Sequence, residues 1–190
     1  RVLDEIAPFA TQMDFDNAGF LVGRGDKTVT RLLVSLDITE AVAREAAQQG
    51  AQLIVSHHPV IFHPIRSLTD GDPTGRTLLA LAEDGIAAIC AHTNLDASVG
   101  GVNDALAARL GLTDTVVLEP SGTDRQGRPI GIGRAGKAPA GVPTHTADYA
   151  AFVKEALGAM YLLVENGQVM EVAGNLCPKG KDYVTQEVVD

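Results

Sequence analysis

The chain has 190 residues, 45% of them apolar, which is enough for one compact domain or two small ones with a sizeable core. Its formal net charge of −9 repels a nucleic-acid backbone, and no apolar run is long enough to span a bilayer, so we expect neither nucleic acid nor a membrane as a partner. The two cysteines make no disulfide framework, and we expect a cytoplasmic protein.

Strand and helix signals alternate through the first part of the chain. Buried strands are predicted at Leu32–Leu36, Leu53–Ser56 and Ile86–Ala91, with a further strand at Val116–Leu118. Apolar residues at helical spacing predict helices at Glu40–Gln49, with Thr39 as the N-cap, at Thr77–Asp84 and at Val102–Leu110. This alternation indicates an α/β fold, with a layered and largely parallel sheet built from βαβ units.

The second part of the chain has a less regular pattern. A weak edge strand is predicted at Ile130–Arg134 and a Pro- and Gly-rich loop at Lys137–Pro143. A helix is predicted over Thr146–Leu157, with an inward face made of Ala147, Ala150, Ala151 and Val153. Further strands are predicted at Tyr161–Val164, Val169–Ala173 and Tyr183–Val189. We expect residues 1–190 to form a single domain, with 1–120 and 121–190 as sub-lobes.

Polar side chains follow three consecutive predicted strands. These are Asp37 after the first strand, His57 and His58 after the second, and His92 with Asp96 after the third. In a parallel sheet those strand ends lie along one edge, where open α/β sheets place their binding sites. Imidazole and carboxylate groups suit Zn²⁺, Fe²⁺ and Mn²⁺. The pattern therefore predicts a metal site at this edge.

The adjacent histidines leave more than one interpretation open. Neighbouring side chains in an extended chain point to opposite sides, and Pro59 favours an extended His58. His57 and His58 could therefore share one ion only at a frayed strand end, or they could serve two neighbouring ions. In the alternative without a metal, one of them caps the strand and the other is solvated. For Asp37 we favour a role in satisfying loop backbone groups.

Other polar and reactive residues give weaker signals. Gly100–Gly101 opens a predicted helix and could cradle a phosphate, but an ordinary loop is the favoured interpretation. Asp16–Gly19 is interpreted as an Asx-type turn leading into a strand, with no sign of a catalytic role. Cys90 is expected to be a small buried hydrophobic residue. His63 is placed in a loop, where it either supports the metal ligands or is merely exposed, and His145 is expected at the surface.

Several segments together resemble the NIF3-like family, also described as GTP cyclohydrolase I type 2 homologues. They occur in the family's order over roughly the first 135 residues, with the pairing of SHHP and AHTNLD the most specific. The matching segments are Ala7–Gly23, Ser35–Thr39, Leu53–Leu68, Ala91–Ala107 and Gly131–Gly136.

The resemblance implies a site for two divalent metal ions, with Zn, Fe or Mn as candidates. Carried over by position, His57, His58 and Asp96 match metal ligands of the family, and His92 either supports those ligands or is an alternate ligand. The family's remaining ligands are a His and a Glu in a C-terminal segment that this sequence lacks, and Glu187 is not a safe substitute. The resemblance also implies a homohexamer.

Two functions of different classes follow from this site. The first is a metal-dependent hydrolase that acts on a small molecule, a nucleotide such as GTP in view of the family's name. The alternative is a non-catalytic metal-binding protein that serves as a metal carrier or as a regulatory interaction partner. In a third, purely structural interpretation, the ions only hold strand ends together.

Overall fold

The computed structural model describes residues 1–157, 161–165 and 168–173. Contacts between residues divide the chain into two compact units. The first unit contains residues 1–103 and 117–133, and the second contains residues 104–116 and 134–190. The architecture is mixed α/β, which confirms the predicted fold class.

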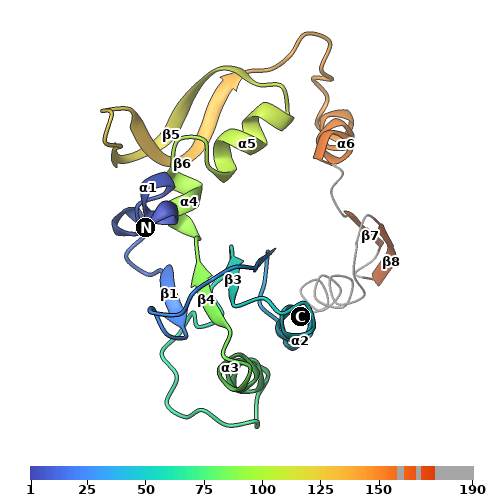
Figure 1. The fold of residues 1–190 in the computed structure, drawn as a ribbon. Helices are drawn as coiled ribbons and strands as arrows, with labels where there is room; N and C mark the ends of the chain where they lie inside the picture. The colour runs from blue at the N-terminus through green and yellow to red at the C-terminus, as the bar shows by residue number, and fades with distance from the viewer. Residues whose placement is uncertain (158–160, 166–167, 174–190) are drawn as a thin grey trace. The chain divides into compact units, whose positions relative to one another are not determined.

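The first unit is built on a four-stranded sheet with the order β1-β4-β3-β2 (Figure 1). Its strands are β1 (Gly19–Val22), β2 (Leu32–Ser35), β3 (Leu53–Ser56) and β4 (Ala87–Cys90). The pairs β2–β3 and β3–β4 are parallel, and β1 is antiparallel to β4. The fourth strand of this sheet is therefore β1. The strand predicted at Val116–Leu118 is confirmed as part of β5 (Thr113–Thr123), but it pairs with β6 (Pro129–Lys137) in a separate two-stranded sheet.

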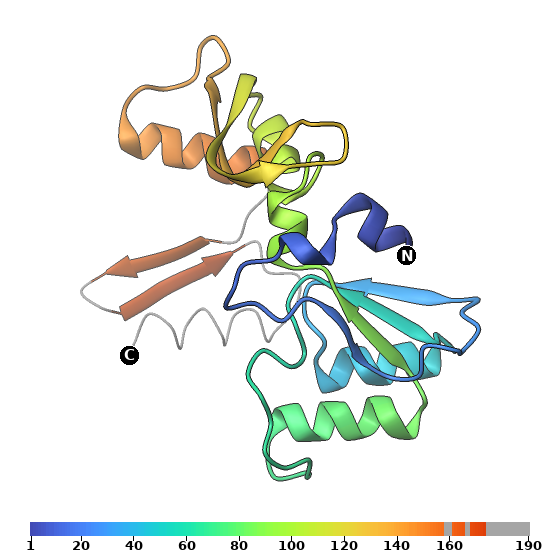
Figure 2. The ribbon, with the colours of Figure 1, turned by 90° about the vertical axis from the view of Figure 1, so that its left-hand side faces the viewer.

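Helices α2 (Glu40–Gln48) and α3 (Pro73–Glu83) lie along the same face of this sheet (Figure 2). The N-cap of α2 is Thr39, as predicted, because its hydroxyl accepts a 3.3 Å hydrogen bond from the Val42 amide. Helix α3 begins earlier than predicted, since Asp72 caps it by accepting a 2.9 Å hydrogen bond from Gly75 N.

The main core lies between that face and the two helices. Its buried residues are Ile38, Ala43, Ala46, Ala51, Ile54, Leu81, Ile86 and Ala88. Small alanines on the helices let them approach the sheet closely, as expected for a chain poor in aromatic residues. On the opposite face Leu32 and Val34 are 52% and 73% exposed, because alternate residues of a strand point to opposite sides.

Shorter elements precede and follow these strands along the chain. Helix α1 (Val2–Ile6) and the 3₁₀ helix η1 (Phe9–Thr11) precede β1, and helix α4 (Thr93–Ala97) follows β4. Helix α5 (Val102–Arg109) comes next and leads into a hairpin of β5 (Thr113–Thr123) and β6 (Pro129–Lys137). The sequence predicted only parts of both hairpin strands, and it did not predict α4.

The second unit includes α6 (Thr146–Leu157) and the antiparallel pair β7 (Tyr161–Glu165) and β8 (Gln168–Ala173). Helix α6 has the predicted bounds, and of its predicted inward face Val153 is partly buried, but the three alanines are not. Ala147, Ala150 and Ala151 are exposed, whereas the larger Tyr149 and Phe152 are partly buried, because they remove more apolar surface from water. The predicted strand at 183–189 lies outside the described residues. Among the described residues, no helix combines the length and apolar character needed to cross a membrane.

Candidate metal centre

The carboxyl ends of the three parallel strands lie side by side, and the predicted histidines follow them directly. His57 and His58 come immediately after β3, and His92 comes two residues after the end of β4. The ladder between β2 and β3 continues past the strands, since His57 N donates to Ser35 O at 3.3 Å and His58 N to Leu36 O at 2.9 Å. The backbone of both histidines is therefore fixed by the sheet.

The three imidazoles form a compact group. His57, His58 and His92 each offer a ligand nitrogen, and these atoms lie within 4.8 Å of one another. The ring centroids are 5.1 Å apart for His57–His58 and for His57–His92, and 5.7 Å apart for His58–His92. The chain bends at His57 and His58, so adjacent imidazoles can contribute to one group. Two side chains hold this bend, with Ser56 Oγ donating to His58 O at 2.8 Å and Cys90 Sγ to His57 O at 2.9 Å.

Each imidazole uses its Nδ1 in a hydrogen bond to an oxygen. Nδ1 of His57 is 3.0 Å from the Ala91 carbonyl, Nδ1 of His58 is 2.7 Å from Asp37 Oδ1, and Nδ1 of His92 is 2.8 Å from Asp16 Oδ1. A carbonyl or an ionised carboxylate can only accept, so each Nδ1 carries the proton. In a neutral imidazole Nε2 then keeps its lone pair, which is the form that binds metals. This arrangement of His ligands with oxygen acceptors behind them is typical of protein metal sites.

Asp96 borders the imidazole group without being part of it. Its Oδ1 lies 3.7 Å from His57 Nε2, and the two side chains are 23% and 21% exposed. It lies on α4, where Asp96 N donates to His92 O at 3.0 Å. The sequence predicted only that His92 and Asp96 follow the strand, and it is this helical turn that sets the separation between them.

Asp37 does not have the role that we favoured from the sequence. Its carboxylate contacts the imidazole of His58 rather than loop backbone groups, because the ends of β2 and β3 are adjacent. The side chain of Asp37 is 54% exposed and that of His58 is 46% exposed, so water weakens this contact.

Asp16 is the site residue that sequence analysis missed. Burial alone would raise the pKa of Asp16, but hydrogen bonds from Thr93, His92 and Asn17 hold the pKa below its ordinary value. Asp16 precedes β1, and Gly19 pairs with Cys90 because β1 runs antiparallel to β4. The start of β1 therefore lies at the same edge as the ends of the parallel strands. The predicted Asx-type turn is not what the structure has, since Asp16 Oδ1 accepts from the amide of the next residue, Asn17, at 2.7 Å and not from the residue two positions on. The predicted strand does follow, but its direction was not evident from the sequence.

The N-terminal segment is attached to this edge by residues of α4. Asn94 is fully buried, and its Nδ2 donates to the Ala7 carbonyl at 2.8 Å. Its Oδ1 accepts a hydrogen bond from His92 N at 2.9 Å. Thr93 Oγ1 accepts from Met13 N at 2.9 Å. These bonds fix the loop that carries Asp16 against the backbone that carries His92.

The remaining candidates do not join the group. Cys90 is fully buried, as predicted, its thiol donates to the His57 carbonyl, and burial raises the pKa of the thiol to about 12. Gly101 N donates to Ser98 O at 3.0 Å, so this amide is not free to bind a phosphate. A Cβ at Gly101 would lie 1.8 Å from the Leu95 carbonyl, which explains the glycine by close packing. His63 and His145 are exposed.

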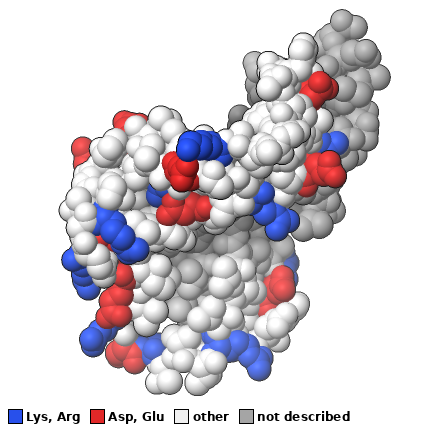
Figure 3. Space-filling model, turned by 90° about the horizontal axis from the view of Figure 1, so that it is seen from above, with Lys and Arg blue, Asp and Glu red and all other residues white. Residues whose placement is uncertain are grey.

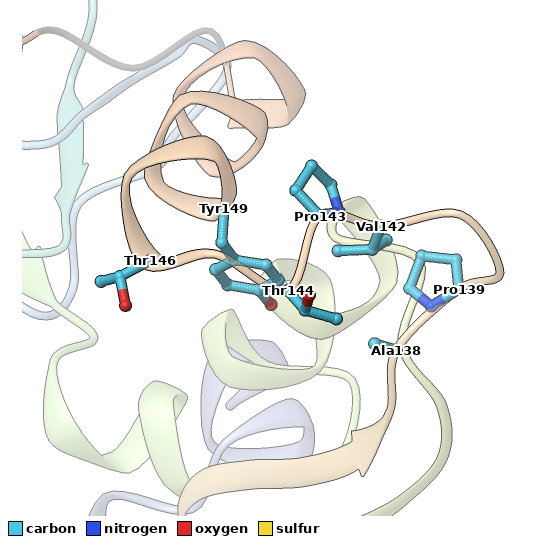
Figure 4. A pocket seen from close by; sticks show the side chains of 7 residues that line it. All are labelled: Ala138, Pro139, Val142, Pro143, Thr144, Thr146 and Tyr149. Carbon is cyan, nitrogen blue, oxygen red and sulfur yellow. The ribbon is translucent and has the colours of Figure 1, made fainter.

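A separate hollow lies in the second unit and has a different character. It is lined mainly by apolar groups from the loop that follows β6 and by the start of α6 (Figure 4). Tyr149 is the one titratable residue among those that line it. On the face seen in Figure 3 acidic and basic side chains are interspersed, with no continuous basic area among the described atoms. Among the described residues, the histidine group is therefore the best candidate for chemistry.

Comparisons with known proteins agree on one family. The profile of the family described as Duf34/NIF3 (NGG1p interacting factor 3) matches residues 1–184. A Clostridium perfringens protein named GTP cyclohydrolase 1 type 2 homolog is 38% identical over 134 residues, which are 70% of this chain and 50% of that protein. The Bacillus subtilis protein of the same name is 37% identical over 124 residues, or 65% of this chain and 33% of that protein. The chain thus spans half or less of the length of these relatives.

Solved structures show the same relationship. A Bacillus cereus protein described as related to NIF3 superposes with a TM-score of 0.61 at 39% identity, over 63% of this chain and 33% of that one. Reduced HcgD from Methanocaldococcus jannaschii superposes with a TM-score of 0.65 at 29% identity, over 81% of this chain and 56% of that one.

Proposed function

Because this chain belongs to the Duf34/NIF3 family, we propose that it binds two divalent metal ions through His57, His58 and His92, with Asp96 as a further ligand. The observation that carries the proposal is the convergence of three imidazoles whose Nδ1 atoms are each occupied by an oxygen acceptor. Imidazoles used only for packing have no need to bring one ring nitrogen of each within 4.8 Å of the other two. Nitrogen ligands with one neighbouring carboxylate suit Zn²⁺, Fe²⁺ or Mn²⁺.

We propose further that the bound ions serve a hydrolytic reaction on a nucleotide. Bound divalent ions lower the pKa of water to near neutrality and polarise the group that is attacked. The partly exposed His57 and Asp96 leave this edge of the sheet accessible to a small molecule. The name of the curated relatives, GTP cyclohydrolase 1 type 2 homolog, favours a guanine nucleotide as the first substrate to test. A homo-oligomer, a hexamer by resemblance, is part of the same proposal, and light scattering measures it.

Metal content and affinity test the site. The purified chain is expected to bind Zn²⁺, Fe²⁺ or Mn²⁺, and His57→Ala, His58→Ala and His92→Ala are each expected to weaken binding by more than about 100-fold. The matched control is His145→Ala, because that histidine is exposed and distant in sequence. Equal affinity in all four variants, or no binding by the parent chain, would overturn the metal site.

Turnover distinguishes the hydrolase from a metal-binding protein without catalysis. The metal-loaded chain is incubated with a panel of nucleotides, and products are separated by chromatography. Hydrolysis that stops with EDTA and with His57→Ala supports the proposal. Tight metal binding without turnover of any nucleotide refutes the hydrolase and favours the carrier or regulatory alternative.

A further inference from the structure

The carboxylate of Asp16 is buried and contacts His92, one of the three histidines of the group. Its side chain is 0% exposed, and both of its oxygens accept hydrogen bonds. Oδ1 lies 2.8 Å from His92 Nδ1 and also accepts from Asn17 N at 2.7 Å. Oδ2 accepts from Thr93 N at 3.1 Å and from the Thr93 hydroxyl. A buried carboxylate with this many donors is held firmly in one orientation.

The contact between Asp16 and His92 determines which nitrogen of His92 carries its proton. An ionised carboxylate only accepts, so Nδ1 of His92 donates to it and Nε2 carries the lone pair. The contact also fixes the rotation of the ring, since Nδ1 must stay within hydrogen-bond distance of a carboxylate that is itself fixed.

We propose that Asp16 is a positioning residue that holds His92 in the Nδ1–H form, which leaves the lone pair of Nε2 for a metal ion. The role of His92 as a ligand rests on the metal site proposed above, but the tautomer of His92 does not. Asp37 makes a similar contact with His58, yet both of those side chains are about half exposed. Water competes with that contact, so we expect Asp16 to matter more than Asp37.

The tautomer can be measured without any metal. The full chain, labelled with ¹⁵N in its histidines and kept in EDTA at about pH 8, gives long-range proton–nitrogen correlations that distinguish the two neutral forms. His92→Gln identifies the signals of His92. The expected result is a protonated Nδ1 and an unprotonated Nε2. A protonated Nε2 in the parent chain would overturn the proposal, and a failure to bind metal would leave this result intact.

Binding of Co²⁺ alone measures the consequence at the site. Asp16→Asn is expected to weaken Co²⁺ binding by about 10- to 100-fold and to change the visible spectrum of the bound ion. The matched control is Asp14→Asn, because Asp14 is exposed and two positions away. It is expected to leave both readouts unchanged.

A double-mutant cycle separates positioning from a general effect on folding. If Asp16 acts through His92, then Asp16→Asn causes no further loss of affinity in a chain that already carries His92→Ala. An equal loss in both backgrounds, or an effect no larger than that of Asp14→Asn, would refute the proposal. If Asp16→Asn does not fold, as a lost thermal transition would reveal, the tautomer measured in the parent chain decides the question.

Discussion

Replacing Asn94 by alanine is expected to destabilise the chain more than most changes of a polar residue. Asn94 is fully buried, and its amide satisfies two backbone groups, the Ala7 carbonyl at 2.8 Å and the His92 N–H at 2.9 Å. A buried group left without a partner costs about 1–3 kcal/mol, and the contact with His92 N is only partly buried, so the expected loss is about 2–5 kcal/mol of unfolding free energy. Because the bond to His92 fixes the backbone of a proposed ligand, metal affinity should fall as well.

Urea unfolding in EDTA, followed by circular dichroism, measures this loss without a contribution from bound metal. The matched control is Asn103→Ala, because among the described residues Asn103 Nδ2 donates to a single backbone group, the Asp96 carbonyl at 2.8 Å, and that contact is partly buried. The control is expected to lose about 1 kcal/mol or less. A loss below about 0.5 kcal/mol for Asn94→Ala would show that the two backbone groups find other partners, and the reasoning about this edge would fail.

Three further predictions follow from single contacts. Cys90 is fully buried, and burial raises the pKa of its thiol to about 12. In a Cys177→Ser chain, Cys90 should therefore resist a thiol reagent at about pH 8 until urea unfolds the protein. Fast labelling of the folded chain would contradict the burial of Cys90. Burial tends to raise the pKa of Asp124, but hydrogen bonds from the amide and side chain of Arg128 and from the Gln126 amide lower the pKa below its ordinary value of 3.8. These bonds should therefore persist at pH values above 3.8 and be lost as the pH falls through the lowered pKa. A carbon-13 titration of the Asp124 carboxyl with its midpoint at or above 3.8 would refute this. Thr39→Ala should cost about 1 kcal/mol in urea unfolding, and an unchanged midpoint would show that α2 does not depend on its N-cap.

The sequence alone was sufficient to predict the local strands and helices and to place the three histidines at one edge of the sheet. The apolar run at Leu53–Ser56 and the N-cap at Thr39 are local signals, and the structure has both where they were predicted. The alternation of strands and helices implied parallel pairing, and parallel pairing is sufficient to place His57, His58 and His92 at one edge. These features depend on neighbours in the chain and on the short reach of βαβ connections.

The tertiary structure decided the contacts that depend on distant partners. The direction of β1 brings Asp16 to His92, which lies 76 positions away, and no local signal specifies that pairing. Two adjacent imidazoles join one group because the chain bends after β3, and that bend is held by the Cys90 thiol from another strand. Propensity and periodicity describe a segment in isolation, whereas a binding site consists of side chains that only the packing of several segments brings together.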